Sequence, residues 1–224
     1  MKNLTFYLLL LASMLVSYSN LVAQQREIYT HPDFDVYAKD HQVLAIIPFK
    51  AVVKLRPKEM EKLSDEEYKR MLLDEGLSVQ SALQTYYFRR QEEGKVHPRY
   101  QVQPIANTNA TLKKAGITQD NYDTYTIEEL AQILKVDAII HGELNTSKPM
   151  SEGASAALGV AFGMYGSTNS GDINLNLSDG KTGTLLWKYD KTLSRSLGSD
   201  TQTVINTLMK KATKKWPYDE MEVQ

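Results

Sequence analysis

The sequence predicts an α/β fold of the α+β type, with a single mixed sheet of about five strands flanked by helices in one domain over residues 43–216. Two apolar runs rich in β-branched residues, Val43–Phe49 and Val136–Ile140, have the composition of buried strands. Each lies beside a segment with apolar residues at helical spacing, and a pair of strictly alternating segments follows the second run. The predicted order is β-α-β-α-α-β-(insertion)-β-β-α.

The first predicted strand is Val43–Phe49, in which Pro48 removes a backbone donor and ends regular pairing. We expect Ala51–Leu55 to extend this strand beyond a kink. A second strand is predicted at Tyr100–Ile105, where residues alternate and Pro104 marks a strand end or a sheet edge.

A long helix is predicted between these strands, from about residue 65 to residue 91. Ser64 and Glu67 have the spacing of a capping box, which satisfies the free backbone donors at a helix start. Gly76 lies on or beside the apolar stripe, where the missing side chain allows a neighbour to approach closely. The stripe is formed by Tyr68, Met71, Leu72, Val79, Leu83 and Tyr86.

The segment 126–144 is predicted to be the centre of the fold, with a short helix running directly into a buried strand. Thr126 can cap this helix, and two glutamates occupy its first turn, where the helix dipole favours carboxylates. The strand Val136–Ile140 follows after one or two residues, as in layered α/β domains. Another short helix is expected just before Gly116.

A β-hairpin is predicted after the insertion. Residues 172–178 and 184–189 alternate between apolar and polar side chains, and Asp179–Gly183 has the composition of a turn. A last helix is expected around residues 204–209, ending before Trp216.

The ends of the chain are predicted to lie outside this domain. Residues 1–23 have the features of a signal peptide, with Lys2 before the apolar run Leu4–Val16 and a small-residue cleavage site ending at Ala23. Residues 24–42 are expected to form an extended N-terminal arm, and residues 217–224 an acidic tail. The chain has no cysteine, so no lipid anchor or disulfide is expected. These features predict an exported protein that is periplasmic or associated with the outer membrane.

A Gly/Ala-rich insertion is predicted at residues 147–171, and its uncharged part at residues 153–170 is the candidate interaction segment. Bulky apolar residues alternate there with mostly small ones, the period of a strand. One interpretation is a flexible surface insertion; others are a hairpin that pairs with another subunit and a segment that touches a membrane. The candidate contact residues are Leu158, Val160, Phe162, Met164 and Tyr165.

No catalytic, cofactor-binding or metal-binding constellation is recognisable in the sequence. A formal net charge of −1 argues against electrostatic binding of nucleic acid. His31 and the nearby aspartates are expected to belong to a solvated arm and not to a metal site. His141, at the end of the central strand, is the best candidate base for an alternative function as an exported hydrolase, although no nucleophile motif accompanies it. A second alternative is a small-ligand module whose pocket is lined by Tyr86, Tyr87, Tyr100 and Trp187.

Three motifs resemble a superfamily of bacterial envelope proteins: Leu44–Phe49, Leu134–Glu143 and Leu177–Trp187. This superfamily includes the CsgG-like curli secretion-channel lipoproteins, the penicillin-binding-protein activator lipoproteins and the N-terminal domain of the Tol-Pal propeller. The resemblance implies a non-enzymatic α/β domain that scaffolds, activates or oligomerises in the envelope. Two departures limit the resemblance: without the anchor cysteine it does not carry over outer-membrane anchoring, and without the long membrane hairpins it does not carry over pore formation. The predicted function is thus a non-enzymatic envelope interaction or assembly protein, a homo-oligomer or an accessory factor for activation or secretion, without a cofactor.

Overall fold

The computed structural model describes residues 26–93, 100–146, 171–193, 210 and 216–220. Its strands form one mixed seven-stranded sheet, so the predicted fold class is confirmed, with more strands than the five or so expected. The elements in chain order are β1 (Arg26–Thr30), α2 (Phe34–Ala38), β2 (Val43–Ile46), β3 (Lys50–Val53), α3 (Pro57–Met60), α4 (Asp65–Glu92), β4 (Gln101–Val102), α5 (Ile105–Lys114), the 3-10 helix η1 (Tyr122–Thr124), α6 (Ile127–Leu134), β5 (Ala138–Thr146), β6 (Gly171–Asp179), β7 (Leu185–Leu193) and α9 (Pro217–Glu220).

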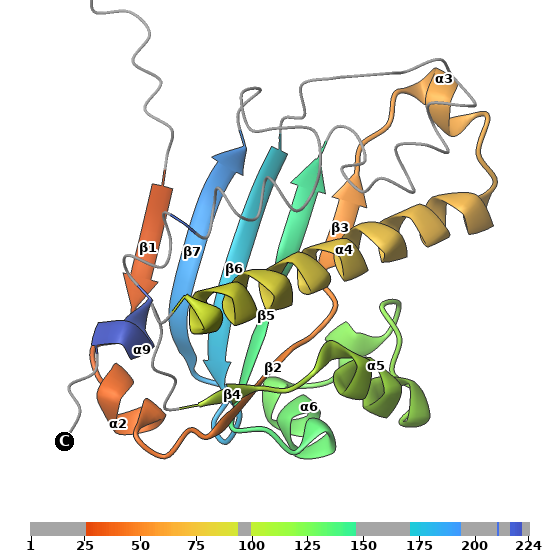
Figure 1. The fold of residues 1–224 in the computed structure, drawn as a ribbon. Coiled ribbons are helices and arrows are strands. Elements are labelled where there is room, and N and C mark those ends of the chain that lie inside the picture. The colour runs from red at the N-terminus through yellow and green to blue at the C-terminus, as the bar shows by residue number, and fades with distance from the viewer. Residues whose placement is uncertain (1–25, 94–99, 147–170, 194–209, 211–215, 221–224) are drawn as a thin grey trace, which may run out of the picture.

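The strands follow the order β1-β7-β6-β5-β2-β4, and β3 pairs with β5 beyond the end of β2. Strand β2 runs parallel to β4 and β5, and β3 is also parallel to β5. On the other side of β5 the strands β6, β7 and β1 form antiparallel pairs. Figure 1 shows α4 lying across one face of this sheet, with α5 and α6 near the end that carries β2 and β4.

The central helix–strand unit forms as its residues predict. Thr126 caps α6 because its hydroxyl accepts a hydrogen bond from the Glu129 N–H, and the Glu129 carboxylate accepts one from the Thr126 N–H. Lys135 ends the helix in the left-handed conformation, with φ of 56°. The strand begins at Ala138, two residues later than predicted, and Ala138 and Ile139 are both fully buried. The inference that this run is an interior strand is therefore confirmed.

Two apolar layers enclose the sheet. On one face, Val79, Ala82 and Leu83 of α4 pack with Leu44 and Leu144 in the larger core. On the opposite face, α5 and α6 cover a smaller core that contains Ala45, Ile47 and Ile139. Side chains of a strand point alternately to the two faces, so neighbouring residues of β2 and β5 enter different cores.

The break between β2 and β3 brings the sheet against α4. Pro48 has no N–H to donate, and the next donor, the Phe49 N–H, bonds to the Gly76 carbonyl of α4 at 3.3 Å. A Cβ atom on Gly76 would overlap the Phe49 carbonyl oxygen. The predicted kink after Pro48 therefore lies against Gly76, where the sequence predicts a close approach. The sequence does not reveal that these two features contact each other.

The two ends of the domain differ from the expected arm and tail. Residues 26–30 pair with β7 along the edge of the sheet, and α2 buries Phe34 and Ala38. At the other end, Trp216 and Tyr218 are buried in the larger core. The sequence does not show that these two ends are buried. Each end contributes only one or two apolar side chains to the core, and the polar residues around them leave no apolar periodicity to detect.

The predicted hairpin, the second strand and the short helix before Gly116 form with shifted bounds, whereas the sequence does not predict α3 and η1. The hairpin β6–β7 forms, with Gly183 at φ of 68° in its turn. Strand β4 has only two residues and lies at the sheet edge. Pro104 is the N-cap of α5, so this helix begins earlier than expected. Within the described ranges, no helix is long and apolar enough to cross a membrane. The predicted signal peptide, the segment 153–170 and the helix around residues 204–209 lie outside the described residues.

Candidate functional site

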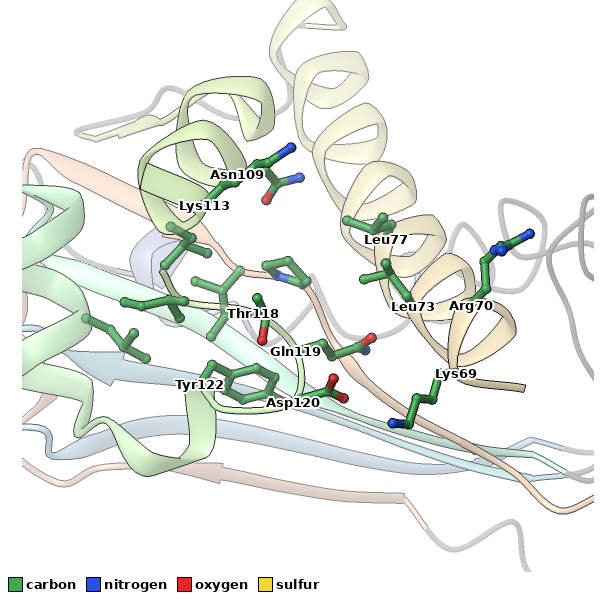
Figure 2. A pocket seen from close by; sticks show the side chains of 15 residues that line it. Lys69, Arg70, Leu73, Leu77, Asn109, Lys113, Thr118, Gln119, Asp120 and Tyr122 are labelled. Atoms are coloured by element: carbon green, nitrogen blue, oxygen red, sulfur yellow. The ribbon is translucent and has the colours of Figure 1, made fainter. Parts of the chain in front are cut away.

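A cavity of about 570 Å³ lies between α4 and α5, beside the break from β2 to β3 (Figure 2). It has an apolar interior and a polar rim. Its apolar lining is Ile47, Pro48, Leu73, Leu77, Leu112, Ile117, Tyr122 and Leu130, and its polar lining is Lys69, Arg70, Asn109, Lys113, Thr118, Gln119 and Asp120. The sequence gives no signal for this cavity, because its walls come from four separate segments.

Side-chain amides hold the walls of this cavity in place. Gln80, which is fully buried, donates to the Ile46 carbonyl at 2.7 Å and exchanges two 2.9 Å hydrogen bonds with the Asn109 amide. Gln119 donates to the Phe49 carbonyl at 2.6 Å. These bonds satisfy two carbonyl groups left free where β2 ends, which would otherwise be costly to bury.

A second candidate surface is the polar face of the sheet. The side chains of β5 that point away from α4 continue beyond Ile139 as His141, Glu143 and Asn145. Residues on the same face of β6 and β7 are also polar, and all of them are partly exposed: Asn174, Asn176, Lys188 and Asp190. We call these seven residues the polar sheet face.

The polar sheet face is internally ordered. Asn174 accepts from the Glu143 N–H at 3.0 Å, and Asn145 donates to the Glu143 carboxylate at 2.7 Å. Lys188 and Asp190 form an ion pair at 2.6 Å. These contacts fix the side chains in a defined arrangement at a solvent-accessible surface, which is the condition for specific polar recognition.

His141, the predicted candidate base, contacts a serine but not a carboxylate. Its Nε2 atom lies 3.0 Å from Ser178 Oγ, and burial lowers the pKa of the imidazole from 6.5 to about 4, so the ring is neutral at pH 7. Ser178 is only 2% exposed, so a substrate could not reach its hydroxyl. Among the described residues, no carboxylate orients the ring, and the pair lacks the third member of a hydrolytic triad.

A buried polar cluster joins the two ends of the domain. His41 Nε2 lies 2.9 Å from Asp179 and its Nδ1 lies 2.5 Å from the Tyr218 hydroxyl. Burial raises the pKa of Asp179, but hydrogen bonds from Thr182 and His41 outweigh it and lower that pKa overall. Burial raises the pKa of Tyr218 well above its ordinary value, with nearby Tyr100 and Asp179 adding to this effect.

His41 and Asp179 of this cluster line a second cavity of about 690 Å³ together with Asp137, and the carboxylates of Asp179 and Asp137 already accept hydrogen bonds. Asp179 also accepts the Thr182 N–H and hydroxyl, both at 2.7 Å, which shapes the hairpin turn. Asp137 accepts the backbone N–H groups of Gln42 and Val43 at 2.8 Å. The cluster therefore acts as a structural clamp.

Of the four aromatic residues proposed as a ligand pocket, Tyr100 and Trp187 are buried core residues, and Tyr86 and Tyr87 are half-buried. Trp187 and Tyr100 are 1% and 3% exposed, and the Trp216 indole N–H donates to the Tyr100 hydroxyl at 2.7 Å. Neither cavity described above is lined by Tyr86, Tyr87, Tyr100 or Trp187.

The other sequence-based candidates give no site in the described part of the chain. His31 accepts from the Asp33 N–H, and no group of potential metal ligands is found within that part. The candidate contact residues Leu158, Val160, Phe162, Met164 and Tyr165 lie outside the described residues. The polar sheet face could have been found from the sequence, because the alternation of β5 continues past Gly142.

No family model and no curated protein matches this chain. Among solved structures, it is similar to the lipoprotein GNA1162 from Neisseria meningitidis, with 17% identity, a TM-score of 0.41 and coverage of 77% of this chain and 94% of that one. The PelC dodecamer from Paraburkholderia phytofirmans gives 10% identity, a TM-score of 0.37 and coverage of 88% and 99%. The LpoB C-terminal domain from Salmonella enterica gives 10% identity, a TM-score of 0.34 and coverage of 73% and 93%. Similarity at this level carries no argument about activity or partners, and the CsgG-like superfamily stays a prediction.

Proposed function

We propose that this chain is an exported, non-enzymatic protein of the cell envelope that binds other envelope proteins or further copies of itself. The polar sheet face is the observation that carries this proposal. It offers ordered amides, a carboxylate and an ion pair at a surface that solvent reaches, without the reactive grouping that catalysis needs. The hydrolase alternative is weakened by the burial of Ser178 beside His141.

Residues 1–23 support the envelope location, and residues 147–170 support a second contact element besides the polar sheet face. The positive, apolar and small-residue regions of residues 1–23 have the order of a signal peptide. Residues 147–170 join Thr146 to Gly171, which are directly paired, so a two-residue turn could close the same gap. We propose that the uncharged part of this connection, with Leu158, Val160, Phe162, Met164 and Tyr165, contacts a partner or a membrane.

Two double variants of the full chain test the role of the polar sheet face. Asn176→Arg with Asp190→Arg changes this face, and Asp74→Arg with Ser81→Arg makes the same change in charge on the exposed side of α4. We expect the face variant to lose complexes seen by cross-linking in envelopes and by size-exclusion chromatography with light scattering. The α4 variant should keep them, and equal complexes from both variants would refute the proposed surface.

Deletion of residues 153–170 tests the second contact element separately. The deletion should leave the circular dichroism spectrum and cooperative unfolding of the domain intact, because Thr146 and Gly171 stay paired. We expect it to abolish the same complexes, and complexes that survive the deletion would exclude this segment as the contact element.

A further inference from the structure

The cavity between α4 and α5 has the dimensions of a small-molecule site. Its volume of about 570 Å³ lies within the range of roughly 300–1,000 Å³ that such sites occupy. Leu73 and Leu77 project from α4 toward the interior in Figure 2, and Ile117 and Leu112 line the cavity as well. Leu73 is 40% exposed, so this wall leaves hydrocarbon in contact with water.

The inner wall has little capacity to bind a polar ligand group. The amides of Gln80 and Asn109 bond to each other, and Gln80 and Gln119 donate to the backbone carbonyls of Ile46 and Phe49. Because these donors are used by the protein, a ligand that enters deeply meets mainly hydrocarbon. This favours an apolar chain in the interior.

The rim has the opposite character. Three cationic side chains line the cavity, Lys69 and Arg70 from α4 and Lys113 from α5, against one carboxylate, Asp120. Figure 2 shows Lys69 and Asp120 below the leucines, with Arg70 directed outward. An excess of positive charge beside an apolar interior is complementary to a molecule with a hydrocarbon chain and one anionic end.

We propose that this cavity binds a single-chain anionic amphiphile of the fatty-carboxylate class. The hydrocarbon chain lies against Leu73 and Leu77, and the carboxylate lies at the cationic rim, where Figure 2 shows Lys113 and Lys69 at opposite ends of the cavity. The site is formed by α4, α5 and the segment around η1, and none of its lining residues belongs to the polar sheet face. Its failure would leave the proposed protein-binding function untouched.

Isothermal titration calorimetry of the full chain with sodium decanoate and dodecanoate, below their micelle concentrations, tests the proposal. Each added methylene should tighten binding by up to about fourfold, as expected when it leaves water. Dodecyltrimethylammonium, which has a chain one carbon longer and the opposite charge, should bind at least tenfold more weakly. Absence of dodecanoate binding, or equal binding of the cationic amphiphile, would overturn the proposal.

Matched variants locate the site. Leu73→Asp places a negative charge at the cavity wall and should abolish dodecanoate binding, whereas Phe88→Asp, at another exposed apolar position of α4, should not. Lys69→Gln with Lys113→Gln should weaken binding by several-fold, up to about fivefold for each exposed charge removed. Lys58→Gln with Lys114→Gln is the control outside the cavity.

Two results from these variants would contradict the assignment. Unchanged dodecanoate binding by Leu73→Asp, in a variant with an unaltered melting temperature, would place the ligand elsewhere. Self-association of the wild-type chain that Leu73→Asp abolishes, without any dodecanoate binding, would show that a second copy occupies this wall and would equally overturn the amphiphile site.

Discussion

Replacing Gly76 by alanine gives opposite expectations from the sequence and from the structure. In the interior of an exposed helix, a glycine-to-alanine change stabilises by about 1 kcal/mol, because alanine has less conformational freedom to lose. Gly76 lies in the fourth turn of α4 (Asp65–Glu92), far from either helix end. Helix propensity alone therefore predicts a more stable protein.

The contacts of Gly76 predict the reverse. An added methyl group would overlap the Phe49 carbonyl oxygen and lie 2.6 Å from the Gln119 amide nitrogen, which itself donates to that carbonyl. Moving α4 away costs about 1–3 kcal/mol of packing strain and weakens two hydrogen bonds, each contributing roughly 1 kcal/mol. After the propensity gain of about 1 kcal/mol is subtracted, the net destabilisation is roughly 2–4 kcal/mol.

Urea denaturation followed by circular dichroism measures this difference, with Ser81→Ala as the control. Ser81 is exposed on the same helix, so its replacement should be neutral or slightly stabilising. A Gly76→Ala variant that is as stable as the Ser81→Ala variant would refute the close contact between α4 and the break in the sheet.

Three further predictions concern single residues. The unfolded chain binds a proton at His141 more readily than the folded one, because the folded pKa is about 4 and the ordinary value is 6.5; stability should fall by roughly 3 kcal/mol as the pH drops from 7 to 4, and His141→Gln should remove this part of the slope in urea titrations. Tyr218→Phe leaves a buried nitrogen of His41 without its partner and should cost about 1–3 kcal/mol in thermal unfolding, whereas Tyr29→Phe at an exposed site should have no effect. Lys135→Gly should stabilise by about 1 kcal/mol, because glycine adopts the left-handed conformation without strain; a loss of stability would contradict the assigned helix end.

The sequence predicts the parts of this fold that depend on neighbouring residues. Capping at Ser64 and Thr126, and the alternation of the β6–β7 hairpin, are local patterns, and all of them form as predicted. The strand at Val136–Ile140 is shifted by two residues because Val136 is buried without joining the ladder. Local pattern identifies an element more reliably than its end.

The candidate sites could be predicted only in part. The polar sheet face follows from alternation, since Glu143 and Asn145 continue the pattern set by Ile139. The α4–α5 cavity does not, because Leu73 and Ile117 meet only after the chain folds and neither is unusual in its own segment. The same reason explains why Tyr100 and Trp187 could not be assigned to core or pocket beforehand.

The pairing of β1 with β7 has a consequence for how the protein is made. A ribosome releases residues 26–30 long before residues 185–193, and Tyr218 is later still. The pairing of β1 with β7 can therefore form only after nearly the whole polypeptide has been synthesised. Contacts between residues so far apart in the sequence slow folding.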